Sequence, residues 1–307
     1  MWRRSLPTNL TTCLAVLAAA VHYAVFRDGF VPRYPQDYAI IVFLYLVTLG
    51  VIWTFPIYKR ELGAYFQNPG VYVTLAVFLA VSGWFVYSGI AWFIRLCMDP
   101  RMKYQYGMAS FNFTEFVVKD TFGIISFLFL FVIPLLTMRL FAEEKKSGTF
   151  EILTTCPVTA WGRVLGKYLA ALTVVVILLV VSLIFPAIFG WLGDPEWPVV
   201  VSSYLGLLLI GTAYVAFGTF ASTLTENQII AAVVTFFGLL AFYLIGDMGF
   251  AGVGAVSRVF DALSIREHSD NLIRGRILTE DITYFVAFAV GFLFLANHVL
   301  ESRRWRV

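Results

Sequence analysis

The sequence has little charge, since only 13% of its 307 residues are Asp, Glu, Lys or Arg, while 60% are hydrophobic. A typical water-soluble domain has about 25% charged residues, enough to cover its surface. The mean hydropathy of +0.83 therefore excludes an ordinary soluble domain. We expect an integral membrane protein with no nucleic-acid partner.

Motifs for catalysis and cofactor binding are also missing. The stretch from Gly162 to Lys167 has one residue too few between its glycines for a P-loop, and Tyr168 stands where a P-loop needs Ser or Thr. The three histidines have no partner at metal-ligand spacing. Cys13 falls in a predicted span, Cys97 on the predicted outer side of the membrane and Cys156 on the inner side, which predicts no intramolecular disulfide. We expect no catalytic residue, cofactor or metal in this chain.

What the sequence does contain is a series of long apolar runs. A helix needs about 20 apolar residues to cross the hydrocarbon core, because lipid cannot satisfy its backbone groups. Runs of this length are not the short alternating strands of a membrane β-barrel. They predict an all-α integral membrane protein of about eight spans, at residues 10–26, 38–56, 71–94, 121–141, 169–192, 199–224, 229–246 and 281–300.

The first predicted span has two interpretations. Its basic start and small residues would also suit a cleaved secretory signal. We favour a retained span, because a second span follows at once.

A short amphipathic stretch follows the second span. Lys59, Arg60 and Glu61 stand beside Leu62 and Tyr65, a mixture that suits a helix lying at a membrane interface. We expect an elbow helix on the cytoplasmic face, and the alternative is a plain basic loop.

The cytoplasmic interruption with enough polar sequence to bind a partner runs from Met138 to Tyr168. Thr149 can cap a short helix that Pro157 ends, and Thr159 can cap the fifth span. We predict a helix lying crosswise under the membrane and offering Phe150 and Leu153 to a partner. The alternative is a solvated loop. The polar residues of this stretch that we expect to take part are Glu143, Glu144, Lys146, Gly148 and Glu151.

Charge is scarce inside the predicted spans, which argues against an ion-coupled transporter, because such proteins keep ionisable residues at membrane depth. Asp281 is placed at a span end within reach of solvent. Small residues along 199–224 would let a neighbouring helix approach closely. An external segment at 247–280 holds the only polar cluster that could serve a membrane enzyme, although a solvated loop explains it as well. That cluster comprises Arg266, Glu267, His268, Asp270, Arg274 and Arg276.

Three stretches together resemble one family. The run from Arg139 to Leu153, with Pro157 and Gly166 after it, is similar to the signature of ABC-2 transporter permeases, especially those of the gliding-motility type. Residues 57–69 resemble that family's N-terminal elbow. Residues 263–305 resemble its last external loop and final span.

The resemblance implies a six-helix ABC-2 permease core at residues 57–307, preceded by an extension at residues 1–56 with two extra spans. It implies a partner ATPase subunit that holds ATP and Mg, and a second permease subunit in the same lipid membrane. Residues 149–155 would be the coupling helix that docks into the ATPase. Lys and Arg divide almost equally between the two sides, so the resemblance sets the orientation, with both termini cytoplasmic.

The resemblance thus implies an export permease of the cell inner membrane that lacks an ATPase site of its own. A non-transporting membrane scaffold of a motility or secretion machine is the alternative. The transported substrate cannot be identified from the residues.

Overall fold

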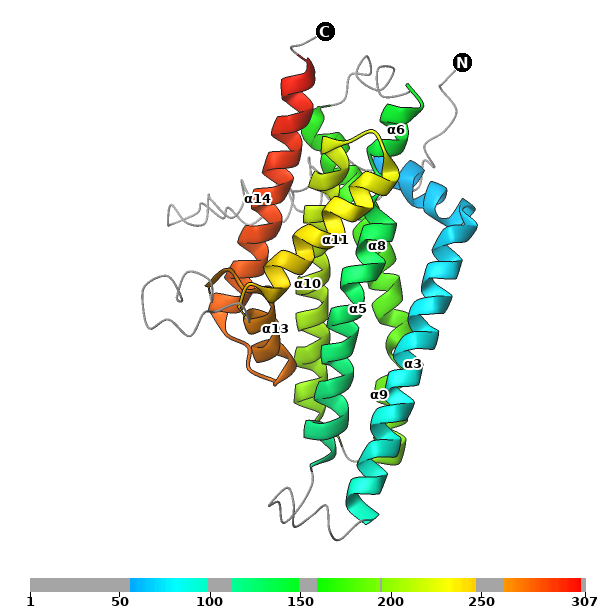
Figure 1. The fold of residues 1–307 in the computed structure, drawn as a ribbon, viewed down its shortest axis with the longest axis vertical. Helices are drawn as coiled ribbons and strands as arrows, with labels where there is room; N and C mark the ends of the chain where they lie inside the picture. The colour runs from blue at the N-terminus through cyan, green and yellow to red at the C-terminus, as the bar shows by residue number, and fades with distance from the viewer. Residues whose placement is uncertain (1–55, 99–111, 149–158, 194, 247–261, 305–307) are drawn as a thin grey trace, which may run out of the picture.

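The computed structural model describes residues 56–98, 112–148, 159–193, 195–246 and 262–304, and the regular elements in these ranges are all helices (Figure 1). The predicted first span, nearly all of the second, and the predicted coupling helix at 149–155 lie outside the described residues. So do Thr149, Phe150, Glu151, Leu153 and Pro157.

Five helical stretches of the described part are long and apolar enough to cross a membrane. They are Pro69–Met98, Thr114–Lys146, Ala160–Leu192, Trp197–Leu224 and Thr279–Ser302. The principal helices within them are α3 (Pro69–Met98), α5 (Lys119–Thr137), α8 (Ala160–Ser182), α10 (Trp197–Leu224) and α14 (Thr279–Arg304). The shorter elements are η1 (Thr114–Val118), α6 (Ala142–Lys146), α9 (Ile184–Leu192), α11 (Gln228–Leu244) and α13 (Ile265–Ile273).

These helices confirm the all-α membrane fold. The fifth span predicted from the sequence, however, begins at Ala160 rather than at Leu169, because Thr159 caps it: the backbone N–H of Gly162 donates to the Thr159 hydroxyl at 3.1 Å. The predicted cap is therefore confirmed, and the predicted start of the span is wrong. The extra turns carry Arg163 and Lys167, both buried, into the helix.

Helix α10 is the centre of the bundle, in contact with α5, α8, α11, α13 and α14. A Cβ atom on Gly206 would come within 2.8 Å of Leu272 on α13, and one on Gly218 within 2.2 Å of Thr137 on α5. The predicted close approach of neighbouring helices to this span is confirmed.

Proline interrupts one of the spanning stretches. Pro186 lies in the first turn of α9, and its ring would clash with the carbonyl four residues earlier, that of Ser182. The α-helical hydrogen-bond pattern accordingly stops at Leu183. Its backbone N–H donates to the carbonyl of Val180, three residues earlier instead of four, at 3.2 Å. The break separates α8 from α9, and both helices are apolar.

Helix α11 does not cross the whole bundle. Its 17 residues extend about 25 Å at 1.5 Å per residue, short of the roughly 30 Å hydrocarbon core. In Figure 1, α11 runs diagonally toward α13, which lies beside the lower half of α10, and α14 returns from there.

Helix α13, which lies in the segment expected to be external, packs against the bundle. Ile265, Leu272 and Ile273 are buried. His268 Nδ1 lies 2.6 Å from Asp281 Oδ1 and its ring stacks on Tyr284, with 4.2 Å between centroids. Asp281 is only 1% exposed, which corrects the expectation that solvent reaches this carboxylate.

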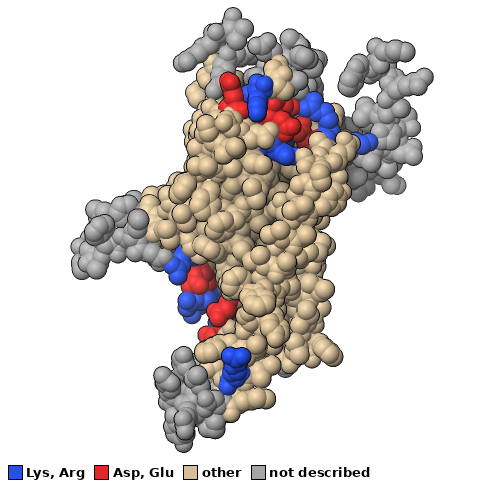
Figure 2. Space-filling view, turned by 45° about the vertical axis from the view of Figure 1, so that its right-hand side comes forward, with Lys and Arg blue, Asp and Glu red and all other residues tan. Residues whose placement is uncertain are grey.

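Charged residues gather in two places on the face seen in Figure 2, at one end of the molecule and on one flank, with a broad uncharged belt between them. Exposed apolar side chains lie on α3, α8 and α14. A surface of this kind suits contact with lipid.

Candidate functional site

The candidate site lies at the end of the bundle that carries α6, the short helix leading into residues 149–158. The backbone N–H groups of Phe141 and Ala142 donate to the hydroxyl of Ser222 on α10, at 3.0 and 3.2 Å. The Lys145 ammonium donates to the carbonyl of Thr223. These bonds satisfy N–H groups that the start of α6 would otherwise leave unpaired and fix α6 to the end of α10.

Four charged side chains meet beside α6, and we name them the four-charge cluster: Arg60, Glu61, Glu144 and Lys167. Arg60 Nη2 lies 2.9 Å from Glu61 Oε1 and 2.7 Å from Glu144 Oε1. Lys167 Nζ lies 3.2 Å from Glu61 Oε1 and 3.0 Å from Glu144 Oε1. Oε1 of Glu61 and Oε1 of Glu144 thus each contact both Arg60 and Lys167. The cluster joins residues 56–67, α6 and α8.

Burial of three members makes the four-charge cluster unlike a surface ion pair, although the Arg60 side chain is 57% exposed. The Lys167 side chain is 1% exposed and the two glutamates are 13% exposed. Lys167 Nζ also lies 5.2 Å from the centroid of the Phe141 ring, within cation–π range. Burial lowers the pKa of Arg60, but the neighbouring Glu61 and Glu144 outweigh it and leave that pKa raised. Removing Lys167 would leave the two glutamate carboxylates in a poorly hydrated place without their buried cation.

The segment predicted as an elbow is helical at residues 56–67 and lies crosswise to α3 in Figure 1. The loop alternative is therefore wrong. The Tyr65 hydroxyl donates to the carbonyl of Leu136 at 2.7 Å, and burial raises the pKa of Tyr65, which keeps it a neutral donor. Tyr58 Oη lies 3.1 Å from Thr173 Oγ1 on α8. The elbow is thus bonded to both α5 and α8.

The other predicted site residues of this end lie around the four-charge cluster. Glu143 is exposed and its Oε2 is 3.9 Å from Nε of Arg139. Lys59 and Lys146 are also exposed. Gly148 ends α6 with φ of +70°, a conformation that a Cβ atom disfavours.

Sequence reasoning missed Lys167 as a site residue. In the sequence it stands in a failed P-loop and in a stretch that resembles the family signature, before the start of the predicted span. The available signal was the Thr159 cap, which starts the helix early enough to put Lys167 inside an otherwise apolar stretch, where a charge calls for a partner.

The arrangement connects helices mechanically. Among the residues that the structure describes, no group of three His, Cys, Asp or Glu side chains could hold a metal ion. What the four-charge cluster can do is make residues 56–67, α6 and α8 respond together to a displacement of α6.

Comparison with known families identifies a family for the chain. A family model described as ABC-2 family transporter protein matches residues 100–297, more than half of the chain. No curated protein matches the chain.

Proposed function

Because the chain belongs to the ABC-2 family of transporter proteins, we propose that it is the permease subunit through which a separate ATPase drives export. Members of the family are multi-pass, non-catalytic membrane components of ABC transporters. In the proposal, the partner binds ATP and Mg, a second permease subunit completes the pathway, and both termini lie in the cytoplasm.

The observation that carries the proposal is the four-charge cluster, which joins α6 to two other elements immediately before residues 149–157. A helix formed by those residues would receive force from the ATPase, and α6 would pass it to the rest of the bundle. Because Lys167 is buried between Glu61 and Glu144, α6 cannot move away from α8 without separating charges.

Exposed residues around α6 suit recognition of the ATPase. Glu143 and Lys146 project from α6, and with Glu151 they would set the register of docking through charge. Phe150 and Leu153 would supply apolar contact area. ATP binding would close the ATPase dimer, displace these segments and switch the spans between inward and outward access.

Docking can be tested by co-expressing the chain with a candidate ATPase subunit and isolating the complex by an affinity tag on the permease. We expect the double variant Phe150→Ala with Glu151→Arg to lose the ATPase. The matched control is Phe294→Ala with Glu280→Arg, which changes the same residue types at exposed positions of α14. Retention of the ATPase by the first variant would disprove the docking assignment.

Transport is tested separately. Vesicles that contain the full assembly should move a substrate only when ATP is supplied. An assembly that binds its ATPase but moves no candidate substrate would favour the scaffold instead.

A further inference from the structure

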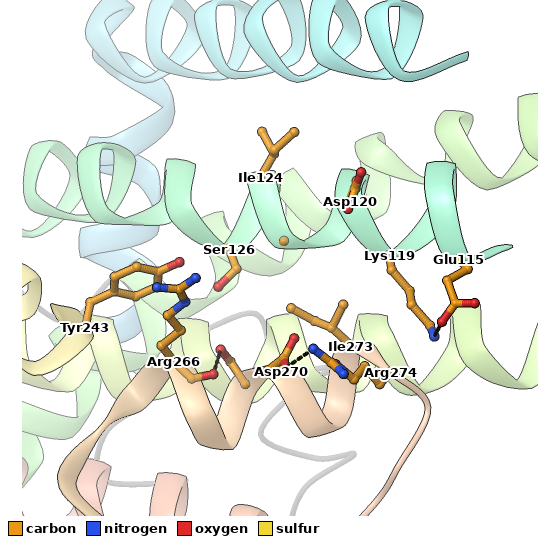
Figure 3. A pocket seen from close by; sticks show the side chains of 12 residues that line it. Glu115, Lys119, Asp120, Ile124, Ser126, Tyr243, Arg266, Asp270, Ile273 and Arg274 are labelled. Atoms are coloured by element: carbon orange, nitrogen blue, oxygen red, sulfur yellow. Dashed lines mark hydrogen bonds and ion pairs between the residues drawn. The ribbon is translucent and has the colours of Figure 1, made fainter. Parts of the chain in front are cut away.

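A second polar region lies away from the four-charge cluster. It is a pocket of about 490 Å³ between α5 and α13, closed at one end by Tyr243 of α11. Figure 3 shows Arg266, Asp270 and Arg274 on α13 facing the α5 side that carries Ser126 and Lys119. The pocket extends along the length of α13.

Positive and negative side chains alternate along both walls. On α13, Arg274 Nη2 pairs with Asp270 Oδ2 at 2.8 Å. On the other wall, Lys119 Nζ pairs with Glu115 Oε1 at 3.2 Å. Asp120 and Arg266 complete a set of three acids and three bases. The lining charge is balanced, so neither a simple anion nor a simple cation matches it as a whole.

Stability does not explain these charges. Arg274 and Asp270 are 57% and 49% exposed and lie one turn apart on the same helix. Such a pair contributes only about 0.3–0.5 kcal/mol. Ionisable residues beside membrane-spanning helices are costly, and they usually line a water-filled or ligand-binding cavity.

Ser126 supplies an independent sign of a ligand. It lines the pocket from α5, it is only 2% exposed, and its hydroxyl has no hydrogen-bond partner among the described residues. Most serines of the neighbouring helices satisfy their hydroxyls, as Ser82 does by donating to Phe78 at 2.6 Å. A buried hydroxyl without a partner is uncommon, and a ligand in the pocket would supply one.

Apolar surface continues from the pocket along α5. Ile124 lines the pocket, and Phe127 and Phe131 are 40% and 45% exposed farther along the same helix. The Phe127 ring lies 5.9 Å from that of Tyr243, so the aromatic surface begins where the pocket ends. A molecule with a polar head in the pocket could lay an apolar tail along this face.

We propose that this pocket binds the head of a zwitterionic amphiphile such as a phosphatidylethanolamine. The phosphate accepts hydrogen bonds from Arg266, Arg274 and the Ser126 hydroxyl, and the ammonium donates to Asp120 and Asp270. Arg274 keeps donors beyond its ion pair with Asp270, because a guanidinium has five N–H groups. The proposal concerns binding and is independent of ATPase docking.

The test uses the full chain purified in detergent, with bound probe measured by native mass spectrometry. The probes are short-chain phosphatidylethanolamine, short-chain phosphatidylglycerol, soluble phosphoethanolamine and inorganic phosphate. We expect the first to bind at least about tenfold more tightly than each of the others, because only it offers both charges and a tail.

Three variants locate the site. Ser126→Ala and Arg274→Gln should each weaken phosphatidylethanolamine binding about tenfold. Gly123→Leu should abolish it by filling the pocket, because Gly123 lines the pocket and a Cβ there meets nothing within 4 Å. The controls Ser82→Ala and Arg276→Gln change positions that do not line the pocket and should bind as the unmodified chain does.

If phosphatidylglycerol bound as tightly as phosphatidylethanolamine, the proposed preference for a zwitterionic head would be wrong. If phosphoethanolamine bound as tightly, the proposed contribution of the tail would be wrong. Undiminished binding by all three pocket variants would overturn the site. Because no ATPase is present, none of these results depends on the docking assignment.

Discussion

At the α6 end, Lys167 and Glu144 come from different elements and meet with 1% and 13% of their side chains exposed. Along α13, Arg274 and Asp270 belong to one helix and stay about half exposed. A buried pair between elements resists their separation, since parting it would strand charge in a poorly hydrated place. An exposed pair within one helix constrains little and keeps donors accessible. Charge thus connects helices in the first region and is available to a ligand in the second.

The largest effect should come from removing the buried cation. Lys167→Met leaves Glu61 and Glu144 close together with only Arg60 between them, and we expect the free energy of unfolding to fall by about 3–5 kcal/mol. Thermal unfolding of the purified chain in detergent measures it. The control Lys119→Met removes a lysine that is 25% exposed and pairs within η1 and α5, so it should cost no more than about 0.5 kcal/mol. Equal losses in the free energy of unfolding would contradict the conclusion that buried charges hold helices together at the α6 end and exposed charges do not along α13.

Sequence patterns predicted the features that depend on residues close together in the chain. Thr159 was identified as a cap because its hydroxyl bonds only three residues ahead, and residues 56–67 were identified as a helix from their own mixture of charges and apolar anchors. The glycines of α10 indicated close packing, although not which helix would approach each one. These features depend on neighbouring residues or on the composition of a single element.

The sequence could not show which distant residues meet. Lys167 finds Glu61 and Glu144 only after three elements pack, so its charge looked like part of a failed nucleotide motif. The charges of α13 looked like those of a solvated loop, because a balanced polar face looks the same whether it meets water or lines a pocket. Burial of Ile265 and Leu272 against α10 is a tertiary property.

A smaller effect should separate two adjacent glutamates. Glu144→Gln removes a charge held by Arg60 and Lys167, and we expect a loss of about 1–3 kcal/mol. Glu143→Gln removes a carboxylate that is 57% exposed and 3.9 Å from Arg139, so the loss should stay below about 0.5 kcal/mol. Thermal unfolding of the two variants side by side makes the comparison. A larger loss at Glu143 would contradict the central place given to Glu144.

Gly148 tests how α6 leads into the docking segment. With φ of +70°, Gly148→Ala should cost about 1–2 kcal/mol in backbone strain. Gly148→Asn should cost less, because Asn tolerates this conformation. If the direction of the chain after α6 positions the ATPase contact, the Ala variant should also retain less ATPase in the affinity isolation than the Asn variant. Equal retention would show that the turn affects stability alone.

The smallest expected change in stability is at the pocket. Arg274→Gln breaks the exposed pair with Asp270, so the free energy of unfolding should change by no more than about 0.5 kcal/mol. Affinity for short-chain phosphatidylethanolamine should nevertheless fall about tenfold, because the phosphate loses a charged donor. Thermal unfolding and native mass spectrometry on the same preparation give both numbers. A loss of stability as large as that of Lys167→Met would mean that the α13 charges hold helices together, as the four-charge cluster does, and that the two regions use charge in the same way.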